Sequence, residues 1–250
     1  MLQTRGNKLT WLGHAAFRVT TPSGKVIVVD PWIQTNPACP DAAKHFDRID
    51  IMLITHGHFD HIADAVELAK KHKPQVVGIY ETCAWLESKG VANTSAMNKG
   101  GTQRVGEIEV TMVHAVHSCG ISDGDKIIYG GEACGYIIRL PGGLTVYHAG
   151  DTSVFGDMKI IGDLYSPELA MLPIGDFYTM GPREAAYAIR LLGVHHVVPM
   201  HFGTFPALSG RPDALRELTK DLKDIEILTL QPGETIGEVR AAKSEAGGKR

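Results

Sequence analysis

Four potential metal ligands stand within six consecutive residues of the sequence, namely His56, His58, Asp60 and His61. Imidazole nitrogens and carboxylate oxygens are the groups that zinc and related divalent ions take from proteins. A regular strand would send alternate side chains to opposite faces, and a regular helix would scatter them around its axis. A turn at a strand end gathers them around one point, and Gly57 favours a turn because it tolerates unusual backbone angles. A polar surface loop is the alternative for one histidine, but four ligands at this spacing predict a metal site.

The elements around this cluster alternate between strand and helix. Residues 51–54 form a short, wholly apolar run, which is typical of a strand buried on both faces. Residues 63–73 predict a helix that Pro74 ends, and residues 76–80 predict the next strand. Residues 105–117 predict one long strand. Strands with helices between them occur in both halves of the chain, which indicates a layered α/β sandwich of two sheets covered by helices.

The composition is that of a globular protein. The 250 residues are 44% hydrophobic and 21% charged, and a chain of this length buries a substantial core without disulfides. No linker divides the sequence, so we expect a single domain over residues 1–240. Residues 241–250 are small and charged, which predicts a disordered tail.

Charge and cysteine content indicate which binding partners and which cellular compartment to expect. The formal net charge is -3 and no basic cluster stands out, which argues against a dedicated nucleic-acid surface. The four cysteines form no C-x-x-C pair, and scattered cysteines suit a reducing compartment. The first residues lack the apolar core of a signal peptide, and no apolar run approaches the ~18–20 residues that span a bilayer. We therefore expect a cytoplasmic protein with a small-molecule substrate and no membrane partner, and the sequence leaves open whether it forms a homo-oligomer.

The H-x-H-x-D-H pattern after a buried strand resembles the metallo-β-lactamase superfamily, and the resemblance covers residues 8–237. The later ligands of that superfamily end separate strands, as His117, Asp151 and His201 do here. The segments WLGHA at residues 11–15 and PIGDFYTMGP at residues 173–182 are similar to one branch of metal-dependent hydrolases, near ascorbate-6-phosphate lactonase. The resemblance implies a four-layer αββα sandwich.

The resemblance also implies a role for each ligand in a centre of two divalent metal ions. The first ion would be held by His56, His58 and His117. The second ion would be held by Asp60, His61 and His201, and Asp151 would bridge the two. Two-metal hydrolases hold their ions about 3.5–4 Å apart, so one carboxylate can contact both. Zinc is the default metal, and manganese, nickel and iron also suit these ligands.

The third histidine of the first ion requires a choice. His114 and His117 are three positions apart in the predicted strand, so strict alternation sends them to opposite faces. His117 stands at the strand end and matches the superfamily pattern. We therefore expect His117 to be the ligand and His114 to be a packed or surface residue.

Other polar residues have two interpretations each. His148 is either a proton donor to the leaving group or a strand-end histidine with satisfied hydrogen bonds, and His14 either reaches the pocket or belongs to a turn. Asp30 and Asp64 are candidates for orienting the ligand histidines, although Asp64 also suits the start of a helix. Residues 176–179 lie between a strand and a helix, where they make either substrate contacts or an ordinary turn.

The expected reaction is hydrolysis by a hydroxide bound to the two ions, with Asp60 and His148 as candidate catalytic side chains. Two cations lower the pKa of bound water and stabilise the charge that develops in the transition state. The Gly-x-Ser-x-Gly elbow of serine hydrolases is absent. The span from Asp151 to His201 is too short for the insert of nucleic-acid-processing relatives, which leaves a small ester, lactone or phosphodiester as substrate.

Two other classes of function use the same residues. One is an iron-dependent oxygenase or redox enzyme on this fold, but flavodiiron relatives carry Glu at the position of His58. The other is a non-enzymatic metal-binding protein, whose closed site would normally have four tetrahedral ligands. The seven-residue ligand set favours the open centre of a hydrolase.

Overall fold

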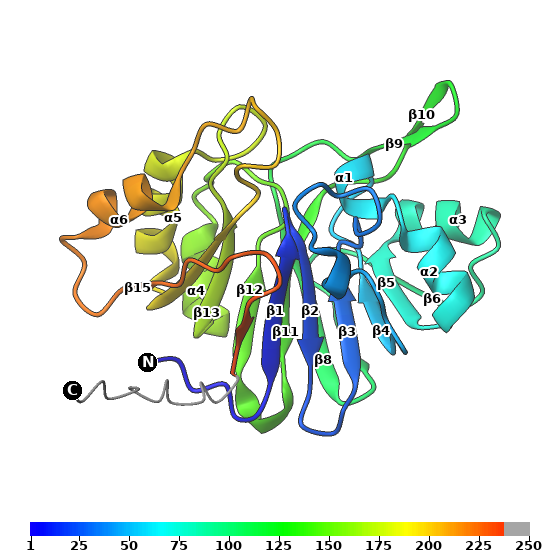
Figure 1. The fold of residues 1–250 in the computed structure, drawn as a ribbon, viewed down its shortest axis with the longest axis horizontal. Coiled ribbons are helices and arrows are strands. Elements are labelled where there is room, and N and C mark those ends of the chain that lie inside the picture. Colours follow the sequence, from blue (N-terminus) through cyan, green and yellow to red (C-terminus); the bar gives the residue numbers. More distant parts are fainter. Residues whose placement is uncertain (238–250) are drawn as a thin grey trace, which may run out of the picture.

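The computed structural model describes residues 1–237, in which two seven-stranded sheets pack face to face and helices cover both outer faces (Figure 1). This arrangement confirms the predicted four-layer αββα sandwich. The single domain over residues 1–240 stays a prediction. The tail predicted over residues 241–250 lies outside the described residues.

The first sheet contains the strands of the N-terminal half and one late strand. Its order is β16-β1-β2-β3-β4-β5-β6, antiparallel from β16 to β3 and parallel from β3 to β6. These strands span Thr235–Ile236, Lys8–Gly13, Ala16–Thr20, Val26–Val29, Ile51–Leu53, Gln75–Ile79 and Thr94–Met97. The outer face is covered by helices α1 (Phe59–Ile62), α2 (Ala65–His72) and α3 (Tyr80–Ser88), with the 3-10 turn η1 (Asp41–Ala43) nearby.

The second sheet has the order β15-β14-β13-β12-β11-β8-β7, parallel from β12 to β15 and antiparallel elsewhere. Its strands span Glu226–Ile227, His196–Met200, Leu169–Pro173, Thr145–His148, Cys134–Arg139, Ile108–His114 and Thr102–Val105. Its outer face is covered by α4 (Met158–Tyr165), α5 (Pro182–Leu192) and α6 (Pro212–Thr219). The remaining elements are the hairpin β9 (Gly120–Asp123) and β10 (Lys126–Tyr129) and the 3-10 turn η2 (Pro141–Gly143).

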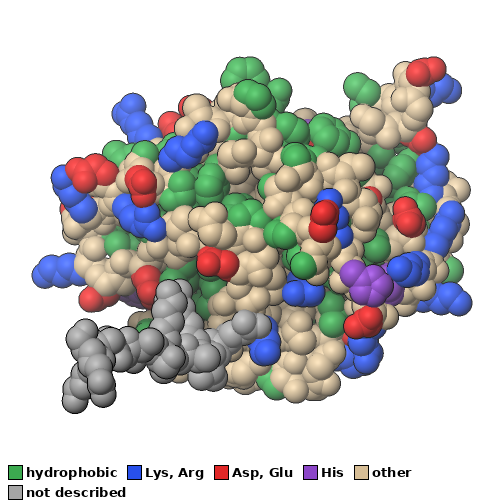
Figure 2. Space-filling model, viewed as in Figure 1, with side chains coloured by type: hydrophobic (Ala, Val, Ile, Leu, Met, Phe, Trp, Pro, Cys, Tyr) green, Lys and Arg blue, Asp and Glu red, His purple; other side chains and the backbone are tan. Residues whose placement is uncertain are grey.

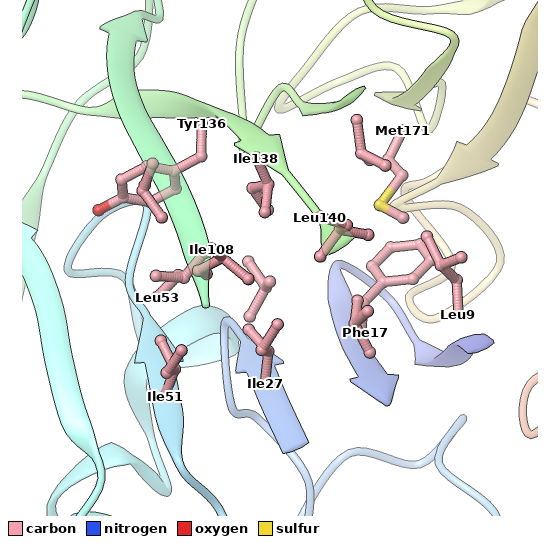
Figure 3. Close-up of a cluster of buried hydrophobic side chains, with 14 of the residues drawn as sticks. Leu9, Phe17, Ile27, Ile51, Leu53, Ile108, Tyr136, Ile138, Leu140 and Met171 are labelled. Atoms are coloured by element: carbon pink, nitrogen blue, oxygen red, sulfur yellow. The ribbon is translucent and has the colours of Figure 1, made fainter. Parts of the chain in front are cut away.

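The main core lies between the two sheets. Phe17 and Leu53 of the first sheet belong to one buried cluster with Tyr136, Ile138 and Met171 of the second (Figure 3). Because the strands alternate their side chains between faces, each sheet also contributes to an outer core beneath its helices. The helices therefore hold each sheet from outside while the sheets meet in the middle.

Two predicted elements near the cluster are divided in the structure. The strand expected over residues 105–117 is shorter: β8 covers only Ile108–His114, residues 115–117 lie beyond it, and Val105 ends β7 because the chain reverses at Gly106, whose φ is +59°. The helix expected over residues 63–73 begins only at Ala65, and α1 precedes it. Consequently Asp60 and His61 lie in a short helix rather than in a turn.

Strands that run in the same direction end at the same edge of the molecule. This edge carries the segments that follow β1, β3 and β4 in one sheet and β8, β12, β13 and β14 in the other. Every candidate ligand lies in α1 or in one of these segments. The hairpin of β9 and β10 projects beyond the same edge (Figure 1).

The face of the molecule drawn in Figure 2 carries acidic and basic side chains side by side, and hydrophobic side chains gather along the edge near α1 and the hairpin. Within residues 1–237, none of the helices combines the length and the apolar character that a membrane span needs.

Candidate metal centre

Three imidazoles converge at the junction of the two sheets. His56 and His58 follow β4, and His117 follows β8 of the other sheet. Nδ1 of His58 lies 3.1 Å from Nε2 of His56 and 3.2 Å from Nε2 of His117. Each pair of rings is 4.6–5.0 Å apart and nearly perpendicular. Three ring nitrogens that share one small space are suited to ligating a single divalent ion.

A second group lies beside the first and comes from α1 and from the end of β14. Oδ2 of Asp60 is 3.9 Å from Nε2 of His61 and 3.7 Å from Nε2 of His201. His61 and His201 are fully buried, whereas Asp60 is partly exposed. His201 itself has a φ of +56°, which turns the chain sharply where the strand ends. These three side chains form a second compact set of nitrogen and oxygen ligands.

Asp151 lies between the two groups. Its Oδ2 atom is 3.0 Å from Nε2 of His201 and 3.3 Å from Nε2 of His61, on the side of the second group. The same atom is 3.6 Å from Nε2 of His117 and 3.9 Å from Nε2 of His56, on the side of the first group. One carboxylate oxygen is therefore close to both groups.

The polar atoms at the centre are buried but unpaired. Nε2 of His61, Nε2 of His201 and Oδ1 of Asp151 have no hydrogen-bond partner. A buried polar atom without a partner costs about 1–3 kcal/mol, so native proteins rarely leave several together. A divalent cation would satisfy all three, since neutral imidazole and carboxylate are its ordinary ligands. The residues present therefore fit divalent metal ions.

Three of the candidate ligand histidines, His56, His58 and His61, have their other ring nitrogen held by a neighbouring side chain. Nδ1 of His61 donates to Oδ2 of Asp30 at 2.8 Å. Nδ1 of His56 is 3.0 Å from Oγ1 of Thr55, and Nε2 of His58 is 3.1 Å from Oγ of Ser118. Such partners fix the ring and leave its other nitrogen free for an ion. Thr55 and Ser118 are adjacent in sequence to the ligands His56 and His117, but no motif marked them.

The two aspartates suggested as orienting residues differ in role. Asp30 is fully buried and accepts hydrogen bonds from the backbone N–H and hydroxyl of Thr55 as well as from His61, as expected. Oδ2 of Asp64 instead accepts the backbone N–H groups of Ile33 and Gln34. Asp64 therefore fixes the loop after Trp32 and does not contact a ligand histidine.

The electrostatics of the group keep its carboxylates ionised. Burial opposes ionisation of Asp151, but the nearby His201 and His61 hold its pKa well below the usual range. Burial likewise opposes ionisation of Asp60, and the hydrogen bond from His14 holds the pKa of Asp60 low. Burial lowers the pKa of His56, so its imidazole is neutral and free to ligate. The two carboxylates thus supply negative charge to a cation at neutral pH.

The reason for glycine at position 57 differs from the one expected. Gly57 is not among the residues with positive φ, so an unusual backbone angle does not require it. A Cβ atom there would lie 2.3 Å from Cγ1 of Ile121 in β9. Its N–H also donates to Sγ of Cys119 at 3.3 Å. Glycine is needed because the hairpin packs directly against the ligand segment.

His148 and His114 both lie outside the two groups, in different environments. His148 is fully buried, and its ring nitrogens bond the backbone oxygen of Ala15 at 3.0 Å and the N–H of Gly150 at 3.2 Å. This geometry supports the interpretation of His148 as a strand-end histidine with satisfied hydrogen bonds and does not support a proton donor. His114 is exposed and contacts Lys99, as expected for a residue outside the centre.

Comparison with known proteins agrees with this fold and site. Residues 25–202 match the family described as "Beta-lactamase superfamily domain". Igni18, a metallo hydrolase from the hyperthermophilic archaeon Ignicoccus hospitalis, is 36% identical, and the match covers 92% of this chain and 97% of Igni18 with a TM-score of 0.81. The fold and the site together define a metal-dependent hydrolase of the β-lactamase superfamily, which confirms the predicted resemblance.

Two relatives identify a narrower family within this superfamily. A UPF0173 metal-dependent hydrolase of Koribacter versatilis is 60% identical over 234 residues, which cover 94% of this chain and 99% of the relative. Another, from Methanopyrus kandleri, is 45% identical over 231 residues, which cover 91% of this chain and 98% of the relative. The chain belongs to this UPF0173 family of metal-dependent hydrolases.

Proposed function

We propose that this hydrolase uses two divalent ions, most simply zinc, to cleave a small ester, lactone or phosphodiester. His56, His58 and His117 would hold one ion, and Asp60, His61 and His201 the other. Asp151 would contact both. The observation that carries the proposal is the position of Oδ2 of Asp151. This atom lies within 4 Å of ring nitrogens of two histidines in the first group and of two histidines in the second.

The ions, when bound, supply a lowered pKa for water and positive charge opposite the anion that develops during cleavage. The chain itself supplies orientation. Asp30, Thr55 and Ser118 hold three imidazoles so that one nitrogen of each faces inward. Burial of His56, His61 and His201 keeps bulk water from competing for those nitrogens. No seryl or cysteinyl nucleophile is required.

The position and backbone of the loop after β13 support the proposal that this loop binds the substrate. It leaves the second sheet between the strands that precede Asp151 and His201, and the N–H of Met180 donates to the backbone oxygen of Thr152. Asp176 and Phe177 both have positive φ, at 67° and 61°. Consecutive left-handed residues other than glycine are costly, and such strain is concentrated at functional sites.

The same loop presents exposed apolar side chains. Phe177 and Tyr178 are 72% and 56% exposed, and their rings meet edge to face at 4.7 Å. Phe59, between the ligands His58 and Asp60, is 55% exposed and packs edge-on against Trp32. These residues favour a substrate that places an apolar group beside the bond to be cleaved.

The test begins with ion content. The purified chain should contain two divalent ions per molecule by elemental analysis, and chelation should abolish hydrolysis of a panel such as p-nitrophenyl acetate, a lactone and bis-p-nitrophenyl phosphate. Adding zinc or manganese back should restore it. Full activity in the ion-free chain would contradict the proposal. A visible spectrum typical of bound iron, together with oxygen consumption, would favour the redox alternative.

A further inference from the structure

His14 occupies an unusual place beside the second group. It lies between β1 and β2, where the chain reverses, and has a φ of +56°. Its side chain is completely buried. A buried polar side chain in a left-handed conformation is costly on both counts, so it persists where its contacts require it. Those contacts lead to the candidate metal ligands.

Both ring nitrogens of His14 are engaged. Nε2 lies 2.9 Å from Oδ2 of Asp60, and Nδ1 lies 3.0 Å from Oγ1 of Thr204. A carboxylate only accepts hydrogen bonds, so Nε2 carries the proton and donates to Asp60. Nδ1 of the neutral ring then accepts the hydroxyl proton of Thr204. The ring is thereby fixed in one tautomer that points its N–H at Asp60.

The backbone of His14 is tied to the same group. Its carbonyl oxygen accepts the N–H of His201 at 3.0 Å and Nε1 of Trp11 at 2.9 Å. The His14 ring also lies 3.8 Å from the ring of His201. His14 thus lies against Asp60 and His201, and its ring also meets that of His61 edge to face at 5.8 Å. It joins the turn of the first sheet to the end of β14.

Spacing alone would admit His14 as a further ligand, because its ring nitrogen lies within 4.8 Å of a carboxylate oxygen of Asp60 and of ring nitrogens of His61 and His201. Three observations place it behind Asp60 instead. Nε2 carries the proton that it donates to Asp60, so this nitrogen has no lone pair free for an ion. Its ring is closer to His201 than the 4.6–5.0 Å that separates the converging rings of the first group. His61 and His201 face Asp151, whereas the carboxylate contact of His14 is Asp60.

We propose that His14 is a positioning residue that holds Asp60 toward the second ion and so sets the affinity of that ion selectively. Without the donor, Asp60 is free to rotate about its side-chain bonds and loses its alignment with His61 and His201. Partners of this kind typically change metal affinity about 10–100-fold. The inference rests on the two-ion centre proposed above.

The test is a zinc titration of the ion-free full chain. Calorimetry in the presence of a competing chelator measures the affinity of each ion. Wild type should bind two ions. His14→Ala should bind one ion as wild type does and the other about 10–100-fold more weakly. His14→Gln, whose amide N–H can still donate to Asp60, should recover most of the loss. His114→Ala, which removes an exposed histidine outside the centre, should match wild type.

The outcomes separate the two proposals. A wild-type chain that binds only one ion overturns the two-ion centre itself. Two ions bound with unchanged affinities in His14→Ala overturn the role of His14, and so does an equal loss of both ions in a folded variant. If His14→Ala does not fold, Thr204→Val decides, because it removes only the hydroxyl that fixes the ring. Thr204→Val should weaken the same single ion, and unchanged affinity would reject the proposal.

Discussion

Asp30 and His61 are joined by a hydrogen bond of 2.8 Å between two completely buried side chains. Asp30 follows β3 and His61 lies in α1, so the bond connects the sheet to the helix that carries two ligands. Because the same carboxylate also binds Thr55, its position is fixed by three donors. The imidazole of His61 therefore presents Nε2 to the centre in a single orientation.

Removing this carboxylate should weaken ion binding. We expect Asp30→Ala to lower the affinity of the ion held by His61 about 10–100-fold, because the ring loses the partner that orients it. Zinc titration of the ion-free chain measures the change. Asp64→Ala is a matched control: Asp64 is also a buried aspartate, but it binds the backbone of Ile33 and Gln34. Equal ion affinities in the two variants would contradict the assigned role of Asp30.

The number of ions lost should depend on which ligand is removed. His117→Ala should retain one ion, because Asp60, His61 and His201 remain as a complete group. Asp151→Ala should weaken both ions, because its carboxylate oxygen is close to both groups. Elemental analysis after dialysis gives the count directly. Two ions retained by Asp151→Ala would show that this carboxylate does not join the groups.

The loop after β13 should affect substrate binding rather than ion binding. We expect Phe177→Ala and Tyr178→Ala to raise KM for substrates with an apolar group, with a smaller effect on kcat. Their ion content should equal that of wild type, because neither side chain belongs to the ligand groups. Steady-state kinetics on esters with short and long acyl chains test this. A change in ion content in either variant would place the loop in the metal centre instead.

Crowding at Gly57 should make substitution there costly. Gly57→Ala would bring a Cβ atom to 2.3 Å from Ile121, and overpacking of this kind costs about 1–3 kcal/mol. Thermal unfolding should show a lower Tm and weaker ion binding, because the shift also moves His56 and His58. Gly156→Ala is the control, since a Cβ atom at position 156 would meet nothing within 4 Å. Similar Tm values for the two variants would disprove the steric explanation.

The four cysteines should be unreactive in the folded chain. All are buried and unpaired, and burial raises the pKa of Cys39 to about 11 and that of Cys83 to about 12. Burial also raises the pKa values of Cys119 and Cys134. At pH 8 these groups stay as thiols, whereas unfolded cysteines with a pKa near 8.5 are partly thiolate. A thiol reagent should therefore react slowly with the native chain. After denaturation it should react with all four cysteines. Rapid labelling of the native chain would contradict this burial.

The sequence predicted which residues come together better than it predicted the elements that carry them. His56, His58, Asp60 and His61 were recognisable because four ligand types stand together, and His117, Asp151 and His201 followed from the superfamily pattern. The structure brings all seven together. Spacing did not predict the conformation of this segment, because Ile62 of α1 packs into a core whose other members are distant in the sequence.

Contacts between residues that are distant in the chain could not be predicted from the sequence. The ring of His148 bonds the backbone oxygen of Ala15, which lies in the turn between β1 and β2 of the other sheet. The requirement for Gly57 comes from Ile121, in a hairpin that the apolar pattern did not predict. Asp64 stands at the start of α2, as one of its two interpretations expected, but its side chain binds the chain after Trp32 and not the N–H groups of the helix. Each outcome depends on a neighbour that periodicity does not identify.

The pairing of β16 with β1 has a consequence for biosynthesis. A ribosome makes β1 before all the other strands described and β16 after them, yet Leu9 faces Ile236 in the finished sheet. During translation the outer edge of β1 therefore has exposed N–H and C=O groups with no neighbouring strand, a state that invites pairing with another nascent chain. The last short strand acts as a cover for this edge, and truncation before residue 235 should leave a polypeptide that aggregates as it is made.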